Sequence, residues 1–156
     1  MSKIATLFAA LLSLGLPQGP AEAGQEPVKP TKPRHAVVVH ASNKTTATGD
    51  AAKAIVKKLF LKDLSQWPDG SDAKVYARES TSPEQAAFRQ DVLGMTEAEL
   101  ARHWLKLKSM NGTTPPKEVE TDRMVLKYVA KNPSALGVVS VDAIKGRDDV
   151  RVLFEF

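Results

Sequence analysis

The chain has 156 residues and a formal net charge of +4, from 22 Lys and Arg against 18 Asp and Glu. It contains no cysteine, which excludes disulfides, thiolate metal sites, a cysteine nucleophile and a lipoprotein anchor. The mild positive charge suits an anionic ligand or an anionic surface, but by itself it establishes neither.

The first 23 residues have the pattern of a secretory signal peptide. Lys3 precedes an apolar run from Ile4 to Leu16, and Ala21-Glu22-Ala23 places small residues at the two positions that a signal peptidase reads. The alternative is a membrane anchor, but the run has about thirteen residues, whereas a span needs about twenty. We therefore predict cleavage before Gly24, export to the periplasm, and no membrane span in the mature protein.

Residues 24–35 are rich in proline and basic residues. Pro27, Pro30 and Pro33 alternate with lysine and arginine, which favours an extended, solvated linker. The remaining residues, 36–156, are enough for one domain with its own core.

The first element of this domain is a strand. Residues 36–40 form a continuous, mainly β-branched run, which is typical of a strand buried on both faces. A polar loop over 41–49 leads to a helix over 50–60. The periodicity predicts an inward side made of Ala51, Ala54, Ile55 and Leu59, with Ala52 and Val56 as further candidates.

The next elements follow a Trp67-Pro68-Asp69-Gly70 turn. A short strand covers 74–78, and Ser82 then caps a helix that runs to Leu93 and stops at Gly94. Thr96 and Glu99 form a capping box for a helix to about residue 108.

The last third begins with a loop over 111–116. Thr121 caps a helix that runs through Lys131, and strands follow over 137–141 and 150–156. The alternation of the final strand predicts that it buries one face only, through Val150, Val152, Phe154 and Phe156.

Strands that alternate with helices predict an α/β fold with a mixed, mostly parallel sheet flanked by helices. In open sheets of this kind, ligands bind beyond the carboxyl ends of the strands. The residues just after His40, Arg78 and Val141 are therefore the places where we expect a site.

The ordered series of motifs resembles the phosphate ABC transporter substrate-binding family of type II periplasmic receptors, especially its small, single-domain members. The resemblance covers roughly residues 36–143. It rests on the strand before Ser42-Asn43, the run from Phe60 to Gly70, the strand ending in Arg78, the turn at Ser82 before Phe88, and the closing strand at 135–139.

The resemblance implies a single receptor lobe that binds phosphate or another small oxyanion without a cofactor or metal. The residues that it assigns to ligand binding are Ser42, Asn43, Arg78, Ser80, Thr81 and Ser82. It also implies a membrane transporter or sensor component as a partner, with transport or sensing as the role. The turn departs from the family's pattern, because Ser80 replaces Asp, Pro83 replaces Gly and Glu84 replaces Thr.

The departures leave an alternative open: an interaction module that keeps the receptor scaffold without its ligand. Arg78 could instead form an ion pair with Glu79, Glu84 or Asp91. Ser82 could instead act as a helix cap. A second lobe supplied by another chain fits either function.

Other functions find little support in the sequence. His35 and His40 point to opposite faces of one strand, so they cannot share a metal there. No nucleophile elbow, phosphate loop or metalloprotease motif is present, so we expect no enzyme. Aromatic residues are few, no nucleic-acid-binding motif is present and export is predicted, so we expect no nucleic acid partner either.

Overall fold

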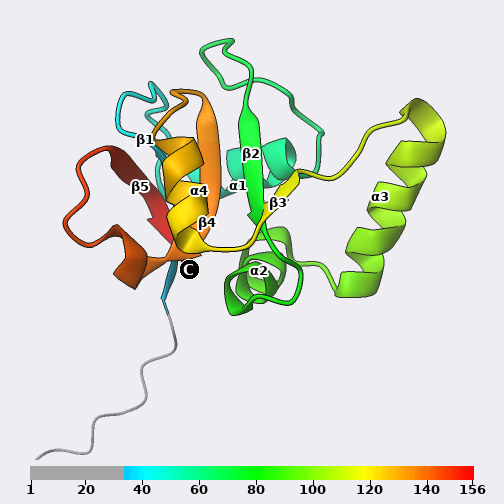
Figure 1. Cartoon of the computed structure of the whole chain (residues 1–156). Coiled ribbons are helices and arrows are strands. Elements are labelled where there is room, and N and C mark those ends of the chain that lie inside the picture. Colours follow the sequence, from blue (N-terminus) through cyan, green and yellow to red (C-terminus); the bar gives the residue numbers. More distant parts are fainter. Residues whose placement is uncertain (1–33) are drawn as a thin grey trace, which may run out of the picture. The chain divides into compact units, whose positions relative to one another are not determined.

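The computed structural model describes residues 34–156, so the predicted signal peptide and almost all of the predicted linker lie outside the described residues. Five strands form one sheet in the order β3-β2-β4-β1-β5 (Figure 1). Their bounds are β1 His35–His40, β2 Lys74–Arg78, β3 Lys117–Val119, β4 Ala135–Ser140 and β5 Val150–Glu155.

The pairing confirms the mixed, mostly parallel sheet. Strand β2 runs parallel to both of its neighbours, β3 and β4. Strand β1 lies between β4 and β5 and is antiparallel to both. Strand β1 therefore ends at the edge of the sheet where β2 and β4 begin.

Helices cover both faces of this sheet, as predicted. Helices α1 (Gly49–Phe60) and α2 (Pro83–Phe88) pack on one face, and α4 (Asp122–Val129) packs on the other (Figure 1). A π-helical turn at Arg89–Leu93 extends α2, and Gly94 ends it with a φ of 63°. Helix α3 spans Glu97–Asn111, and a 3-10 turn covers Val141–Ile144.

The core has two halves, one on each face of β1. Val37 and Val39 point toward α1 and α2, where they belong to the same cluster as Phe88. Ala36 and Val38 belong to the opposite cluster, with Val125 of α4. This arrangement confirms the prediction of a strand buried on both faces.

The tryptophan turn is also confirmed. Trp67 is 3% exposed, and its indole N–H donates to the carbonyl oxygen of Ser134 at 2.9 Å. The Gly70 N–H closes the turn on the Trp67 carbonyl at 2.9 Å, and Gly70 has a φ of 83°. The turn therefore anchors the loop before β2 to the loop before β4.

The predicted inward side of α1 is partly wrong. The structure buries Ala52, Val56, Leu59 and Phe60, and it leaves Ala51 and Ala54 exposed. The reason is area: a face that carries Val56, Leu59 and Phe60 removes more apolar surface from water than a face built on alanines.

The predicted alternation of β5 fails in its middle. Leu153 is buried at 7% exposure, while Val152 is 37% exposed. The pairing of β1 with β5 shifts register between Val37 and Val38, which leaves Leu153 as an extra residue and reverses the faces beyond it. Strand β3 was not predicted at all, because three residues are too few to show a periodicity.

Helix α3 contacts the rest of the domain along one side only, where Leu100 and Trp104 pack against the core cluster of α1 and the His103 Nε2 lies 2.9 Å from the Leu61 carbonyl oxygen. The helix begins at the predicted capping box of Thr96 and Glu99, contains no buried residue, and projects away from the sheet (Figure 1). Leu105 and Met110 are 66% and 68% exposed on it. None of the helices within residues 34–156 has the length and apolar character that crossing a bilayer requires.

Candidate functional site

The strongest candidate site lies where β2 ends. Arg78 is the last residue of β2, and its backbone N–H donates to the side-chain oxygen of Gln85 at 3.0 Å. The Gln85 N–H in turn donates to the Ser82 hydroxyl at 3.2 Å, so Ser82 caps α2 as predicted. These two bonds fix the turn between β2 and α2, and with it the direction in which the Arg78 side chain leaves the strand.

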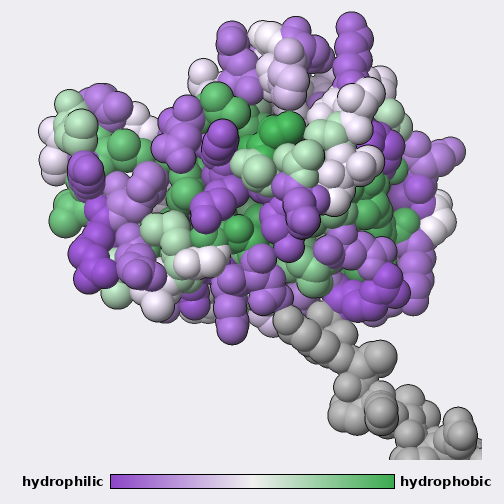
Figure 2. Space-filling view, turned by 180° about the vertical axis from the view of Figure 1, so that it is seen from behind, coloured by the Kyte–Doolittle hydropathy of each residue, from purple (hydrophilic) through white to green (hydrophobic). Residues whose placement is uncertain are grey.

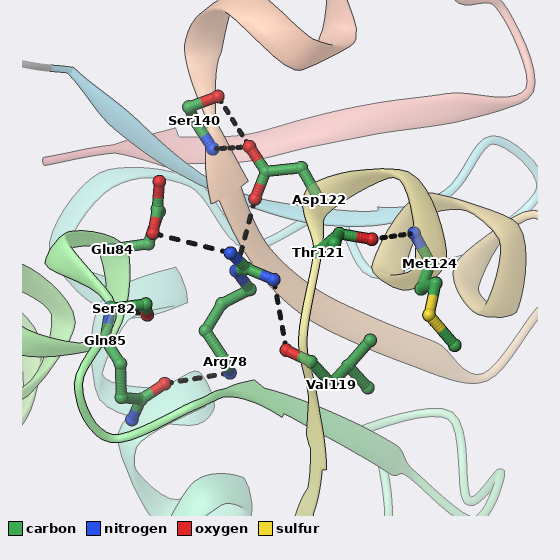
Figure 3. A network of polar contacts seen from close by, with 9 residues as sticks. All are labelled: Arg78, Ser82, Glu84, Gln85, Val119, Thr121, Asp122, Met124 and Ser140. Atoms are coloured by element: carbon green, nitrogen blue, oxygen red, sulfur yellow. Dashed lines mark hydrogen bonds and ion pairs between the residues drawn. The ribbon is translucent and has the colours of Figure 1, made fainter.

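The guanidinium of Arg78 is enclosed by groups of this chain (Figure 3). Its Nη1 donates to the carbonyl oxygen of Val119 at 3.0 Å. Its Nε lies 3.2 Å from the Asp122 Oδ1, and its Nη2 lies 3.7 Å from the Glu84 Oε2. Only 9% of the Arg78 side chain remains exposed, so solvent screens these ion pairs little.

Asp122 holds its position through its other carboxylate oxygen. Oδ2 accepts from the Ser140 hydroxyl at 2.6 Å and from the Ser140 N–H at 3.1 Å. Asp122 opens α4, and the Thr121 hydroxyl caps that helix by accepting from the Met124 N–H at 3.3 Å. A carboxylate at this position also interacts favourably with the helix dipole.

We call Arg78, Glu84, Asp122 and Ser140 the Arg78 cluster. Its formal charge is −1, because two carboxylates face one guanidinium. The Asp122 carboxylate is bound by one guanidinium, one hydroxyl and one backbone N–H, which are the donors that a receptor would offer to a small oxyanion. The chain therefore fills this electropositive position with its own side chains.

The structure brings together only some of the six predicted ligand residues. Arg78 and Ser82 lie in or beside the Arg78 cluster, and Ser80 and Thr81 lie in the exposed turn next to it. Ser42 and Asn43 lie at the opposite edge of the sheet, where Asn43 donates to the Pro133 carbonyl before β4. The cause is the direction of β1, because a strand antiparallel to its neighbours carries its carboxyl end away from theirs.

Asp122 and Ser140 were missed by the sequence reasoning. Of the partners considered for Arg78, Glu84 is in contact with it, whereas Asp122 was not considered. A signal did exist: Asp122 directly follows the Thr121 cap. It was given no role because β3, which brings that cap to the same edge of the sheet as Arg78, was not predicted.

A hollow adjoins the Arg78 cluster on the side that faces α3. It has a volume of about 190 Å³, and Ser80, Arg89, Trp104 and Pro116 contribute to its walls. Charges of both signs line it, because Glu97 and Glu118 face it along with Arg89 and Arg78 itself. Within residues 34–156, no group of three or more His, Asp or Glu side chains is placed to hold a metal ion.

The comparisons with known proteins point to one fold. No family model matches the sequence, and no curated protein does. Among solved structures, a Clostridium perfringens protein with bound phosphate, described as a phosphate ABC transporter substrate-binding protein, matches with a TM-score of 0.57 at 19% identity. An ABC-type phosphate transport receptor from Vibrio cholerae gives the same TM-score and identity.

A third structure, described as a possible phosphate binding protein from Planctomyces limnophilus, matches with a TM-score of 0.55 at 12% identity. Each match covers 78% of this chain but only 45%, 46% and 41% of the respective solved chain. The chain thus spans less than half the length of these structures, which are described as binding proteins and a receptor and not as enzymes. The resemblance inferred from the sequence is confirmed at the level of the fold: this chain has the fold of one part of a phosphate ABC transporter substrate-binding protein.

Proposed function

We propose that the chain is a periplasmic interaction module that keeps one receptor lobe and has replaced the small anion with its own carboxylates. The observation that carries this proposal is the enclosure of Arg78 by Asp122 and Glu84. A phosphate entering this cluster would meet two carboxylates for one guanidinium. At about 4 Å, each like-charge contact costs roughly 1 to 4 kcal/mol at effective dielectrics between those of water and the protein surface.

Two features of the fold support the binding of a partner protein. The matched part of the chain covers less than half of each receptor, which leaves room for a second lobe or a membrane component to complete the assembly. Helix α3 projects from the body with Leu105 and Met110 largely exposed, which is typical of a surface that another protein covers. A transporter or sensor subunit is the class of partner that the fold favours.

The test is site-specific photo-crosslinking in the producing cell. A photoreactive residue at position 105 should give one discrete adduct, and the same residue at position 58, an exposed site of α1, should not. Adducts that are equally diffuse at both positions would contradict the proposal.

Small-oxyanion binding is the second candidate, because one matched structure contains bound phosphate and because Arg78 lies beside the Ser82 cap. In this alternative, the ligand uses Arg78, Ser80, Thr81 and Ser82 and displaces Glu84. Calorimetric titration with phosphate and sulfate decides between the two candidates. Heat that saturates at one ion per chain favours the receptor, and no heat at millimolar ion favours the interaction module.

A further inference from the structure

We propose that a lysine-lined hollow between β2 and the connector that follows α3 binds an extended acidic segment of a partner protein. This inference rests on the proposed function and names the chemistry of the partner. The hollow has a volume of about 550 Å³. It is lined by Lys62, Ala73–Tyr76 and Gly112–Lys117. Figure 2 shows hydrophilic and hydrophobic side chains intermixed on the face seen from behind.

All the charged groups of this hollow have one sign. Lys62, Lys74 and Lys117 reach it from three separate segments, and no acidic residue lines it. None of the three is in an ion pair among the described residues, whereas both neighbouring hollows that contain arginine also contain glutamate. Thr113 and Thr114 add hydroxyl donors to the same wall. The potential in the hollow therefore favours carboxylates.

The conformation of Lys62 is an independent sign that a lysine is needed here. Within residues 34–156, it is the only residue other than glycine with a positive φ, at 64°. It follows the end of α1, the position that glycine takes most often because a side chain is strained there. The helix dipole does not explain the choice, because Lys57 and Lys58 already supply positive charge to the last turn.

The walls of the hollow are shaped for a peptide. Pro115 and Pro116 fix the connector, and Pro116 is buried. Tyr76 supplies an aromatic wall and stacks on Tyr128, and the Lys117 ammonium group lies 4.7 Å from the centre of the Tyr128 ring. A shallow hollow with a basic rim and one aromatic wall suits an extended chain of alternating acidic and apolar side chains better than a flat membrane.

The experiment uses the full chain and a fluorescent ten-residue peptide of alternating Glu and Val, with a peptide of alternating Gln and Val as its counterpart. The acidic peptide should bind, and its affinity should fall with salt, while the Gln peptide should not bind. Lys74→Gln and Lys117→Gln should each weaken binding about threefold to fivefold, because an exposed ion pair contributes up to about that factor. Lys53→Gln on α1, outside the hollow, is the matched control and should change nothing.

Lys62→Gly gives the sharpest result, because it separates binding from folding. It removes one charge and relieves the left-handed backbone, so the peptide should bind more weakly while the melting temperature stays the same or rises. A loss of binding with a lower melting temperature would mean that Lys62 acts through the fold, and would count against the proposal.

Three other outcomes would overturn it. Equal binding of the Gln peptide would show that charge is not recognised. Binding of phosphatidylglycerol vesicles, but not of the peptide, with the same dependence on the three lysines would identify a membrane surface instead. Competition by millimolar inorganic phosphate at constant ionic strength would identify a small-anion site. If the acidic peptide does not bind but the crosslink at position 105 still forms, the proposal of an interaction module is retained. Only the proposed docking surface is then wrong.

Discussion

The Nε of Arg78 lies 3.2 Å from the Oδ1 of Asp122, and this contact joins the end of β2 to the start of α4. The two side chains are 9% and 18% exposed, and the contact is an ion pair without a hydrogen bond between these two atoms. The pair determines what the carboxyl edge of the sheet can bind, because it uses the guanidinium that an incoming anion would need.

Removing the charge of Asp122 should destabilise the fold. In Asp122→Asn, the side-chain oxygen can still accept from Ser140, but the only ion pair that Arg78 keeps is the longer one to Glu84, beside its hydrogen bond to the Val119 carbonyl. We expect the free energy of unfolding to fall by about 2 kcal/mol, since one buried charge loses its nearest partner. Urea denaturation measures the change. Asp148→Asn, at an exposed turn, is the control and should stay within about 0.5 kcal/mol of the parent.

Restoring the family's residues in the turn should open the anion site. The double variant Pro83→Gly with Glu84→Thr returns a backbone N–H donor and removes one of the two carboxylates beside Arg78. We expect phosphate binding that calorimetry detects at millimolar concentrations in the variant and not in the parent. The same result in the Asp122→Asn background should be stronger, because no carboxylate would then face the guanidinium. An unchanged titration in both backgrounds would show that the turn is not a lost binding site.

Gly137 allows α4 to approach β4. A Cβ at this position would lie 2.3 Å from the Val125 Cγ1, which is closer than real contacts allow. Gly137→Ala should therefore lower the free energy of unfolding by about 1 to 3 kcal/mol through overpacking. A double-mutant cycle with Val125→Ala tests the cause, because the truncated side chain should recover about 1 kcal/mol or more of the cost. Strict additivity of the two changes would rule out the clash.

The start of α3 should respond to acid. The backbone N–H and then the hydroxyl of Thr96 hold the pKa of Glu99 below its ordinary value. A lowered pKa means that this carboxylate stabilises the folded state above its unfolded pKa of about 4.3 and stops doing so as the pH falls through the lower folded value. Carbon NMR should record the low pKa, and Thr96→Ala should raise it toward normal. Asp69, whose pKa is lowered by Ser71, is the internal control and should not move.

The local features of the fold could be predicted because a few neighbouring residues determine them. The Trp67-Gly70 turn, the Ser82 cap and the Thr96 capping box depend on groups within a few positions of each other, and all three are present. The buried strand predicted at 36–40 was recognisable because both of its faces are apolar.

The features that failed depend on distant segments. The direction of β1 relative to β2 leaves no trace in the strand's own sequence, yet it decides whether Ser42 and Asn43 reach Arg78. The register shift that buries Leu153 arises between strands from opposite ends of the domain. The contact between Asp122 and Arg78 depends on the pairing of β3 with β2, and β3 was not predicted from the sequence.

We infer that the carboxylates of the Arg78 cluster occupy the position of a bound anion. The most direct test is the NMR signal of the Arg78 Nε–H group, followed while phosphate is added to the protein. If Arg78 is held by its own carboxylates, its Nε–H should exchange slowly with water, because the group is buried against Asp122. The chemical shift of this signal should not change up to millimolar phosphate. A shift that saturates at one phosphate per chain would contradict this inference, because the guanidinium would then be exchanging its own carboxylates for an external anion.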